Sequence, residues 1–548
     1  MKIKRIKKSA CLLILQLLLI YQLLITSCNS KIPVIKSIEP KIGKMGEVIT
    51  LTGYNFGEER GGSNVTIAGI APTNSSYQIW SDGIIRVRTP ESGESGLVYV
   101  YAKGKKSNGV LFSNSAAVPR LPEGAEPGLR PQITSVSPQT GASGNTIIIT
   151  GVNFGASREN SGVFFTWDYE PSSVNPFVVR DPQFIEVSDL EFGYDTWNAR
   201  EIRVRIPDGA ATGNLEVRTP RGKTHPVFFD ISGKPGIKTY KDKRNYSISY
   251  SVDIKVLEAA KPNTLYLWMP RPAVSPSQRN ISLVSRSVTP FVENYRGVSL
   301  YKLENLNSGS SQSVNISYNV EVYAVESGIR PLALKQNETS PFPAYTQSSN
   351  LIPADADIIK NLAAGITGRE KNPYLTARLL YDWLITEMKV EESVLYTSAV
   401  TAAERKITNP CLMVLLYCSL MRACKIPCIP AAGVLVNRSG QTLRHYWAEF
   451  WLDGFGWVPV DPVMGARAVP DDYIIKQDWT NYYFGNIDSQ RIAFSRGEIN
   501  LSRIESRGRL VSHPQSYSLQ NIWEEATGGL ESYSSLWGDI TITGIYVQ

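Results

Sequence analysis

Apolar and polar residues alternate along much of the chain, most regularly between residues 240 and 325. In residues 246–252 and 314–322, tyrosine, isoleucine and valine alternate with serine, asparagine and glutamate. A period of two residues predicts half-buried antiparallel strands. We therefore expect a β-rich bridging domain over residues 239–326, with the role of a scaffold.

The periodicity then changes to that of helices. Residues 377–385 carry apolar side chains at helical spacing. A second helix is expected from residue 410 onwards, because Asn409 is a good N-cap and Pro410 suits the first helical position. Residues 445–462 return to alternation around two glycines, which predicts a strand hairpin. Helices followed by strands indicate an α+β domain over residues 350–500, and residues 501–548 form a C-terminal extension without an assignment.

The first half of the chain contains an internal repeat. Residues 37–40 and 51–57 recur 98 positions later as residues 135–138 and 149–155. Both copies end a β-rich run in Gly-x-Asn-Phe-Gly, a turn whose glycines can adopt positive φ. A repeat of about this size is typical of an Ig-like sandwich.

These repeated residues resemble the IPT/TIG family of Ig-like domains, which occur on many cell-surface proteins. The resemblance implies two all-β sandwiches, over residues 32–114 and 131–231. The second copy carries an aromatic-rich insertion, and we identify Trp167, Tyr169 and Trp197 as candidate ligand-binding residues. The alternative is a rigid spacer, which we favour because a fold by itself does not imply a site.

The N-terminus has the pattern of an exported protein. Five basic residues precede an apolar run over residues 12–25, which predicts a signal peptide over residues 1–27. Residues 25–28, Ile-Thr-Ser-Cys, resemble the bacterial lipobox. The resemblance implies cleavage before Cys28, lipidation of that cysteine and tethering to a membrane that the chain does not span. Asn29 is compatible with the outer membrane, so we expect a lipid-anchored protein of the cell envelope.

Charge excludes one class of partner. The formal net charge is +7, and five of the positive charges lie before the apolar run. The remaining chain is close to balanced, which gives no electrostatic case for binding nucleic acid.

Beyond residue 28 the chain has four cysteines, Cys411, Cys418, Cys424 and Cys428, all within eighteen positions. Their spacing lacks a paired C-x-x-C knuckle and no histidine is near, so we expect neither a metal nor another cofactor. Cys418 is expected in the core, and Cys424 and Cys428 in structural roles.

Cys411 differs from the others because it falls at the second position of the expected helix. The helix dipole and unpaired N–H groups there lower a thiol pKa. His445 is one of only three histidines, and it opens the strand of the expected hairpin. Alternation places His445, Trp447 and Glu449 on one side, and the return strand brings Asp461 back toward His445. Such an acid can orient an imidazole that takes a thiol proton.

The pattern H-x-W-x-E followed by W-x-x-x-D-P resembles the transglutaminase-like superfamily, over residues 372–462. Carried over position by position, the resemblance implies that Cys411 is the nucleophile, His445 the base and Asp461 the group that orients it. It implies attack on an amide carbonyl through a thioester. The expected function is an envelope-anchored cysteine hydrolase acting on peptide or amide bonds.

One departure from the family pattern bears on this expectation. Counting back from Arg422, Ala423, Ile426 and Pro427 places the family's nucleophile on Pro410 rather than on Cys411. Either the helix has lost one residue, or the nucleophile has been lost. Lys425 also stands where the family has a glycine. The alternative function is therefore a catalytically degenerate surface protein that binds a peptide, protein or glycan.

Overall fold

The computed structural model describes residues 31–91, 95–115, 130–158, 160–167, 183–188, 193–334, 342–394, 398–474, 476 and 478–547. The predicted lipidation site Cys28 and the candidate ligand-binding residue Tyr169 lie outside these residues. The chain divides into two compact units, residues 1–127 and 128–548. Within the described ranges, every helix is too short or too polar to cross a membrane.

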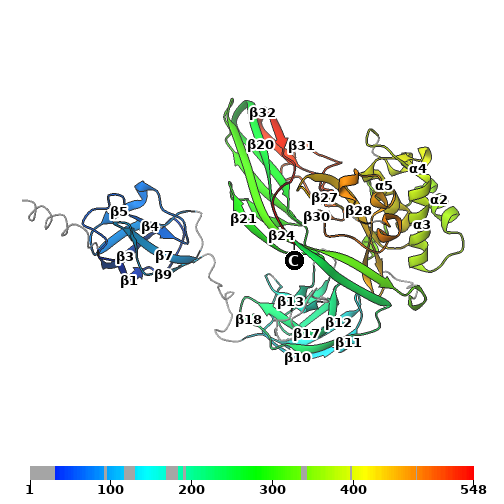
Figure 1. Cartoon of the computed structure of the whole chain (residues 1–548), viewed down its shortest axis with the longest axis horizontal. Helices are drawn as coiled ribbons and strands as arrows, with labels where there is room; N and C mark the ends of the chain where they lie inside the picture. Colours follow the sequence, from blue (N-terminus) through cyan, green and yellow to red (C-terminus); the bar gives the residue numbers. More distant parts are fainter. Residues whose placement is uncertain are drawn as a thin grey trace, which may run out of the picture. The chain divides into compact units, whose positions relative to one another are not determined.

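The first unit is a sandwich of two sheets, as the internal repeat and its resemblance to the IPT/TIG family imply (Figure 1). One sheet has the order β1-β3-β6-β5 and the other β2-β9-β7-β4, with β8 paired to β7. The elements are β1 (Val34–Glu39), β2 (Ile42–Gly43), β3 (Val48–Tyr54), β4 (Asn64–Ile67), η1 (Asn74–Ser76), β5 (Tyr77–Trp80), β6 (Ile84–Arg88), β7 (Gly96–Ala102), β8 (Lys105–Lys106) and β9 (Val110–Asn114).

The second Ig-like sandwich, in the second unit, repeats this topology. Its sheets have the orders β10-β12-β16-β15 and β11-β19-β17-β13-β14. The strands are β10 (Gln132–Ser137), β11 (Thr140–Gly141), β12 (Thr146–Val152), β13 (Gly162–Trp167), β14 (Phe184–Glu186), β15 (Tyr194–Trp197), β16 (Glu201–Arg205), β17 (Ala210–Thr219), β18 (Gly222–Lys223) and β19 (Val227–Ile231).

In the Gly-x-Asn-Phe-Gly motif, we expected both glycines to adopt positive φ, and the structure shows this only for the second glycine. Positive φ falls on Asn55 and Gly57, and on Asn153 and Gly155 in the second copy. Gly53 instead lies within β3, where a Cβ would come within 2.0 Å of the Val34 carbonyl oxygen. The first glycine of the motif is therefore required by close backbone approach, and the turn uses the asparagine and the second glycine.

The bridging domain is built on two long strands, β20 and β24, which pair antiparallel over most of the length of β24. Strands β32 and β33 from the C-terminal extension pair with the other edge of β20, so the extension completes this sheet (Figure 1). The strands are β20 (Gly236–Pro270), β21 (Gln278–Arg286), β22 (Val292–Tyr295), β23 (Val298–Glu304), β24 (Ser311–Ile329), β31 (Arg509–Val511), β32 (Glu524–Trp537) and β33 (Thr541–Val547).

The α+β part packs helices against a sheet of order β29-β28-β27-β30 (Figure 1). Its helices are α2 (Asp357–Thr367), α3 (Pro373–Glu387), α4 (Ala399–Arg405), α5 (Pro410–Ala423), α6 (Pro462–Gly465) and α7 (Trp479–Tyr482). Its strands are β25 (Lys389–Val390), β26 (Ile407–Thr408), β27 (Cys428–Val436), β28 (Thr442–Leu452), β29 (Gly456–Val460) and β30 (Arg491–Arg496). Short 3₁₀ turns are η3 (Pro331–Ala333), η4 (Pro343–Thr346) and η5 (Asp471–Tyr473).

The second sandwich shares a hydrophobic core with this sheet. One cluster of buried residues joins Trp167 and Phe165 of the sandwich to Tyr323 of β24 and to Trp447 of β28. A buried ion pair reinforces the contact, because the Lys238 ammonium lies 2.6 Å from Asp208 and also donates to the Trp457 carbonyl. The second sandwich is thereby a fixed part of the α+β unit.

Candidate active site

Helix α5 begins as the sequence predicts. The Asn409 side chain caps it by accepting from the Leu412 N–H at 2.9 Å, and Pro410 occupies the first helical position. Cys411 is therefore the second residue of the helix, but its side chain is only 4% exposed. Burial raises the pKa of the Cys411 thiol to about 12. Removal from water thus outweighs the helix dipole that was expected to lower this pKa.

The end of α5 accommodates Lys425, which replaces the family's glycine. Lys425 adopts φ of 61°, and its N–H donates to the Arg422 carbonyl. This left-handed conformation is the one that glycine favours after a helix. Arg422 holds the following chain by donating to the Cys428 carbonyl at 2.9 Å. The turn from α5 into β27 is therefore kept without its glycine.

The predicted hairpin is formed by β28 and β29, and it brings His445 and Asp461 together. The Nε2 atom of His445 lies 2.7 Å from Oδ2 of Asp461. The other carboxylate oxygen, Oδ1, accepts from the Met464 N–H and caps α6. Both side chains are buried, with exposures of 1% and 0%.

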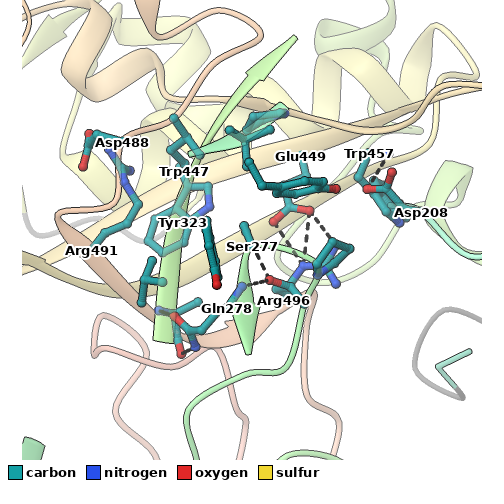
Figure 2. A pocket seen from close by; sticks show the side chains of 18 of the residues that line it. Asp208, Ser277, Gln278, Tyr323, Trp447, Glu449, Trp457, Asp488, Arg491 and Arg496 are labelled. Atoms are coloured by element: carbon teal, nitrogen blue, oxygen red, sulfur yellow. Dashed lines mark hydrogen bonds and ion pairs between the residues drawn. The ribbon is translucent and has the colours of Figure 1, made fainter. Parts of the chain in front are cut away.

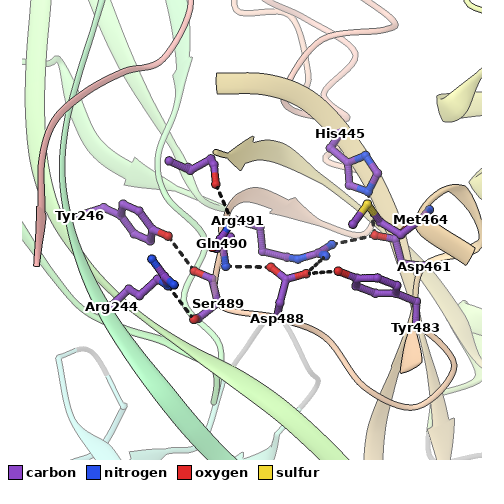
Figure 3. Close-up of polar contacts among 11 residues, drawn as sticks. Arg244, Tyr246, His445, Asp461, Met464, Tyr483, Asp488, Ser489, Gln490 and Arg491 are labelled. Atoms are coloured by element: carbon purple, nitrogen blue, oxygen red, sulfur yellow. Dashed lines mark hydrogen bonds and ion pairs between the residues drawn. The ribbon is translucent and has the colours of Figure 1, made fainter. Parts of the chain in front are cut away.

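A second pair of charges extends this contact into a network (Figure 3). Arg491 donates to Oδ2 of Asp461 at 2.8 Å and to Asp488 at 2.6 Å, and the Tyr483 hydroxyl donates to Asp488 at 2.8 Å. Burial acts to raise the pKa of Asp461, but the charges and hydrogen bonds of His445 and Arg491 overcome it and lower that pKa. For Asp488, burial is likewise overcome by Arg491, and its pKa is also lowered.

Cys411 and His445 lie on opposite faces of the sheet. Tyr446, Ala448 and Phe450 of β28 belong to the same buried cluster as Cys411, and we call this side of the sheet the helix face. The alternate residues His445 and Trp447 point to the other side, which we call the network face. Their rings stack 6.3 Å apart, and Trp447 packs in the cluster of the second sandwich.

The structure therefore brings together two of the three predicted catalytic residues, His445 and Asp461. The polar side chain that lies beside Cys411 is that of Tyr446. Burial and the nearby Cys411 thiol raise the pKa of Tyr446. The Tyr446 hydroxyl donates at 2.9 Å to the carbonyl of Ser516, in the C-terminal extension.

A pocket of about 400 Å³ opens at the start of α5. Residues of the α+β domain and of the C-terminal extension line it together: Glu392, Asn409, Pro410, Cys411, Val434, Thr442, Leu443, Arg444, Tyr446, Gln515, Tyr517, Asp539 and Ile540. Arg444 and Asp539 form an ion pair of 2.8 Å at this pocket. Among the described residues, the buried hydroxyl of Tyr517 has no hydrogen-bond partner. The pocket offers both charges and apolar surface to a ligand.

A smaller cavity, of about 50 Å³, lies on the network face (Figure 2). The labelled side chains come from the second sandwich, the bridging domain and the sheet, and include Asp208, Gln278, Tyr323, Trp447 and Arg491. This volume accommodates only a few water molecules. The cavity is therefore part of the packing between domains rather than a site for a peptide or a sugar.

Two aromatic residues of the second sandwich were candidates for ligand binding, and their contacts assign them packing roles. Trp167 is 4% exposed, and its ring lies between Tyr240, Tyr323 and the Arg279 guanidinium. The Trp197 indole donates to the Phe154 carbonyl at 3.2 Å. In the first sandwich, Trp80 makes the same bond to Phe56 at 3.1 Å. The aromatic character of these positions serves the domain core and its interface.

Sequence reasoning missed Arg491 of β30, which donates to Asp461, and also Asp488 and Tyr483 in the segment before β30, which complete the network around Arg491. No local motif marks them, and a buried arginine becomes apparent only once two carboxylates are placed beside it. Within the described ranges, no three histidine, cysteine or carboxylate side chains gather in an arrangement that could hold a metal ion.

Two family profiles match parts of the chain. The profile of the transglutaminase-like superfamily matches residues 360–462, and that of the IPT/TIG domain matches residues 33–115 and 131–168. An uncharacterized protein of Haemophilus influenzae is 26% identical over 189 residues, which cover 28% of this chain and 49% of that protein. The chain thus spans about half the length of the curated relative it matches.

Solved structures give weaker likenesses. A proposed cysteine protease from Cytophaga hutchinsonii has 15% identity and a TM-score of 0.36, covering 57% of this chain and 92% of that one. The periplasmic domain of TgpA from Pseudomonas aeruginosa has 13% identity and a TM-score of 0.25, covering 46% and 93%. SGBP-B from a xyloglucan utilization locus of Bacteroides uniformis has 12% identity and a TM-score of 0.13, covering 54% and 99%.

These TM-scores are too low to indicate a function. The profile matches agree with the folds described above: the two sandwiches repeat one topology, and α5 with its sheet carries the H-x-W-x-E hairpin. Residues 360–462 therefore form a domain of the transglutaminase-like superfamily, and the chain before it carries two IPT/TIG domains.

Proposed function

We propose that this chain is a binding protein of the bacterial cell envelope, in which the transglutaminase-like domain holds a peptide or glycan without cleaving it. One observation carries the proposal: Cys411 lies on the helix face of the sheet and His445 on the network face. A general base must be within hydrogen-bond reach of the proton that it removes. A thiol separated from its imidazole by a sheet lacks that base.

Two further features support the same function. A pKa of about 12 leaves the Cys411 thiol almost entirely protonated at neutral pH, whereas the thiolate is the nucleophile. In addition, the family's nucleophile position falls on Pro410, which has no side-chain group able to attack a carbonyl. The His445–Asp461 pair then has a structural role, as part of the Arg491 network.

The ligand site that we propose is the pocket at the start of α5. Pro410 and Cys411, the first two residues of α5, line it, and residues of the C-terminal extension form part of its wall. The Arg444 guanidinium suits oxygen acceptors, and the Asp539 carboxylate suits N–H or O–H donors. Peptide groups and sugar hydroxyls both present such atoms.

Anchoring completes the proposal. Lipidation of Cys28 after removal of residues 1–27 would tether the chain to the outer membrane, and the first IPT/TIG domain would act as a spacer. The second IPT/TIG domain shares its core with the transglutaminase-like sheet, so it is better suited to support that sheet than to bind a ligand independently.

A second candidate function is a cysteine hydrolase of peptide or amide bonds. The observation in its favour is the His445–Asp461 contact of 2.7 Å, which is the geometry needed to orient an imidazole. This function requires that the start of α5 or of β28 rearrange, so that Cys411 meets His445.

The pH dependence of thiol alkylation distinguishes the two functions. In the mature, lipid-free protein, we expect iodoacetamide to label Cys411 slowly at neutral pH. The rate should rise only above the ordinary thiol range near pH 8.5 and should be unchanged in His445→Gln. Cys424 is partly exposed and serves as an internal reference in the same peptide digest. Rapid labelling of Cys411 below pH 7 that is lost in His445→Gln would instead establish the hydrolase.

A further inference from the structure

Two other cysteines of the transglutaminase-like domain are in direct contact. The Cys428 thiol donates to the sulfur of Cys418, and the two Sγ atoms lie 3.5 Å apart. Both side chains are fully buried. Cys418 lies in the middle of α5 and Cys428 is the first residue of β27, so this contact joins the helix to the sheet on which it packs.

The chain between the two cysteines is held tightly. Arg422 donates from Nε to the Cys428 carbonyl and from Nη1 to the Gln347 carbonyl, and it is itself only 3% exposed. The Ile426 N–H donates to the Met421 carbonyl, which closes the turn after the helix. These bonds fix the start of β27 against α5, so the two sulfurs are presented to each other by the backbone.

We propose that Cys418 and Cys428 form a disulfide bond in the exported protein. A disulfide has an S–S length of about 2.05 Å, so the sulfurs must approach by about 1.5 Å, within reach of small side-chain rotations. The inference rests on the export step of the proposed function, because disulfides persist in the oxidising space outside the cytoplasm.

The reaction is a thiol–disulfide exchange with a protein disulfide of the export compartment. The S–H bonds of Cys418 and Cys428 break and one S–S bond forms between them, while the S–S bond of the partner breaks. The two electrons and the two protons pass to the partner's sulfurs, which become a dithiol, through a mixed disulfide. Burial and the neighbouring Cys418 raise the pKa of Cys428 in the folded protein, so exchange takes place before α5 closes on the sheet.

The other two cysteines remain thiols. Cys411 packs beside Tyr446 at the opposite end of α5, and Cys424 lies at the end of the helix, where the Thr367 side chain hydrogen-bonds to it. The proposal is therefore specific in its pairing, which the four closely spaced cysteines in the sequence do not reveal.

Peptide mass spectrometry tests the pairing. The full chain is exported through its own signal peptide, quenched in acid, and alkylated with iodoacetamide under denaturing conditions without reductant. We expect a cross-linked pair of peptides containing Cys418 and Cys428, two mass units lighter than the sum of the free peptides, while Cys411 and Cys424 are alkylated. Alkylation of both Cys418 and Cys428, or a cross-link to any other cysteine, would overturn the proposal.

The same digest reports on export separately, because cleavage before Cys28 changes the N-terminal peptide. A processed chain with reduced Cys418 and Cys428 refutes the disulfide alone, whereas an unprocessed chain refutes the envelope location.

A stability measurement on the wild-type protein gives an independent readout, with two variants as controls. Because the bond restricts the unfolded chain, it should raise the melting temperature of the domain, and dithiothreitol should lower it by about 5 °C or more. Cys424→Ala should show the same decrease, and Cys428→Ala should show none. A melting temperature of the wild-type protein that is insensitive to dithiothreitol would contradict the bond.

Discussion

The two faces of the β29-β28-β27-β30 sheet differ in how they bury their side chains. The helix face packs α5 on apolar residues, and the polar group of Cys411 enters that core as a neutral thiol. The network face buries charges: Asp461, Asp488 and Arg491 are each at most 3% exposed, and each carboxylate is paired with the guanidinium. Catalysis by the family's triad needs a thiol and an imidazole within hydrogen-bond reach of each other. Here Cys411 and His445 lie on different faces of the sheet.

Under the proposed binding function, this difference would account for the presence of the His and Asp of a catalytic motif in a protein that does not use Cys411 as a nucleophile. Asp461 caps α6, accepts from Arg491 and contacts His445. Removal of any one of these groups would leave a buried polar partner unsatisfied, which costs free energy whether or not the protein catalyses a reaction. A motif can therefore persist for the stability of the network face alone.

The largest test of this contrast is Arg491→Ala. The substitution leaves two buried carboxylates without their shared cation, and we expect the free energy of unfolding to fall by about 3–5 kcal/mol. Urea denaturation of the full chain, followed by tryptophan fluorescence, measures it.

Arg496→Ala is the matched control on the same strand. Arg496 pairs with Glu449 at 2.6 Å, but these side chains are 10% and 15% exposed, so solvent compensates part of the loss. We expect a smaller decrease, of about 1–2 kcal/mol. Equal losses of unfolding free energy in the two variants would show that the network at Asp461 stabilises the protein no more than the Arg496–Glu449 pair does.

Acid should weaken the network face selectively. Because the pKa values of Asp461 and Asp488 are lowered in the folded protein, the unfolded chain takes up protons first as the pH falls. The stability that these groups contribute is complete above the unfolded value near pH 4 and is lost as the pH falls through their folded pKa values.

The measurement is the melting temperature between pH 6 and pH 2.5, in the wild type and in Arg491→Ala. The difference between the two proteins should be largest above pH 4 and should shrink in more acidic solution. A difference that stays constant over this range would mean that Arg491 does not act through the two carboxylates.

The fold was largely predictable from the sequence, because period-two alternation and the 98-residue repeat are local signals. The two sandwiches, the bridging strands, the capped α5 and the β28–β29 hairpin were all predicted, and the structure contains them. The pairing of β32 and β33 with β20 was not predicted. It joins residues more than 250 positions apart, and alternation gives no information on the partner of a strand.

The candidate site was predictable only in part, for a related reason. Alternation correctly placed His445 and Trp447 on one side of β28, but it could not tell which side faces α5. The position of Cys411 in the helix was also correct, while the direction of its side chain depends on how α5 packs. The off-by-one register at Pro410 was the one local signal of the separation between Cys411 and His445.

The finest test makes one substitution on each face. The Tyr483 hydroxyl donates to the Asp488 carboxylate on the network face, and the Tyr446 hydroxyl donates to the neutral Ser516 carbonyl. Hydrogen bonds to charged groups contribute more than neutral ones, so Tyr483→Phe should cost about 2 kcal/mol of unfolding free energy and Tyr446→Phe about 1 kcal/mol. Both changes remove a single oxygen and leave the ring in place, so cavity formation does not differ between them.

Urea denaturation at pH 7 gives the two values, and at pH 3 the cost of Tyr483→Phe should fall toward that of Tyr446→Phe as Asp488 begins to take up a proton. If Tyr446→Phe were the more costly change at pH 7, the helix face, with its link to the C-terminal extension, would be the more dependent on polar contacts, and the contrast between the two faces would be reversed.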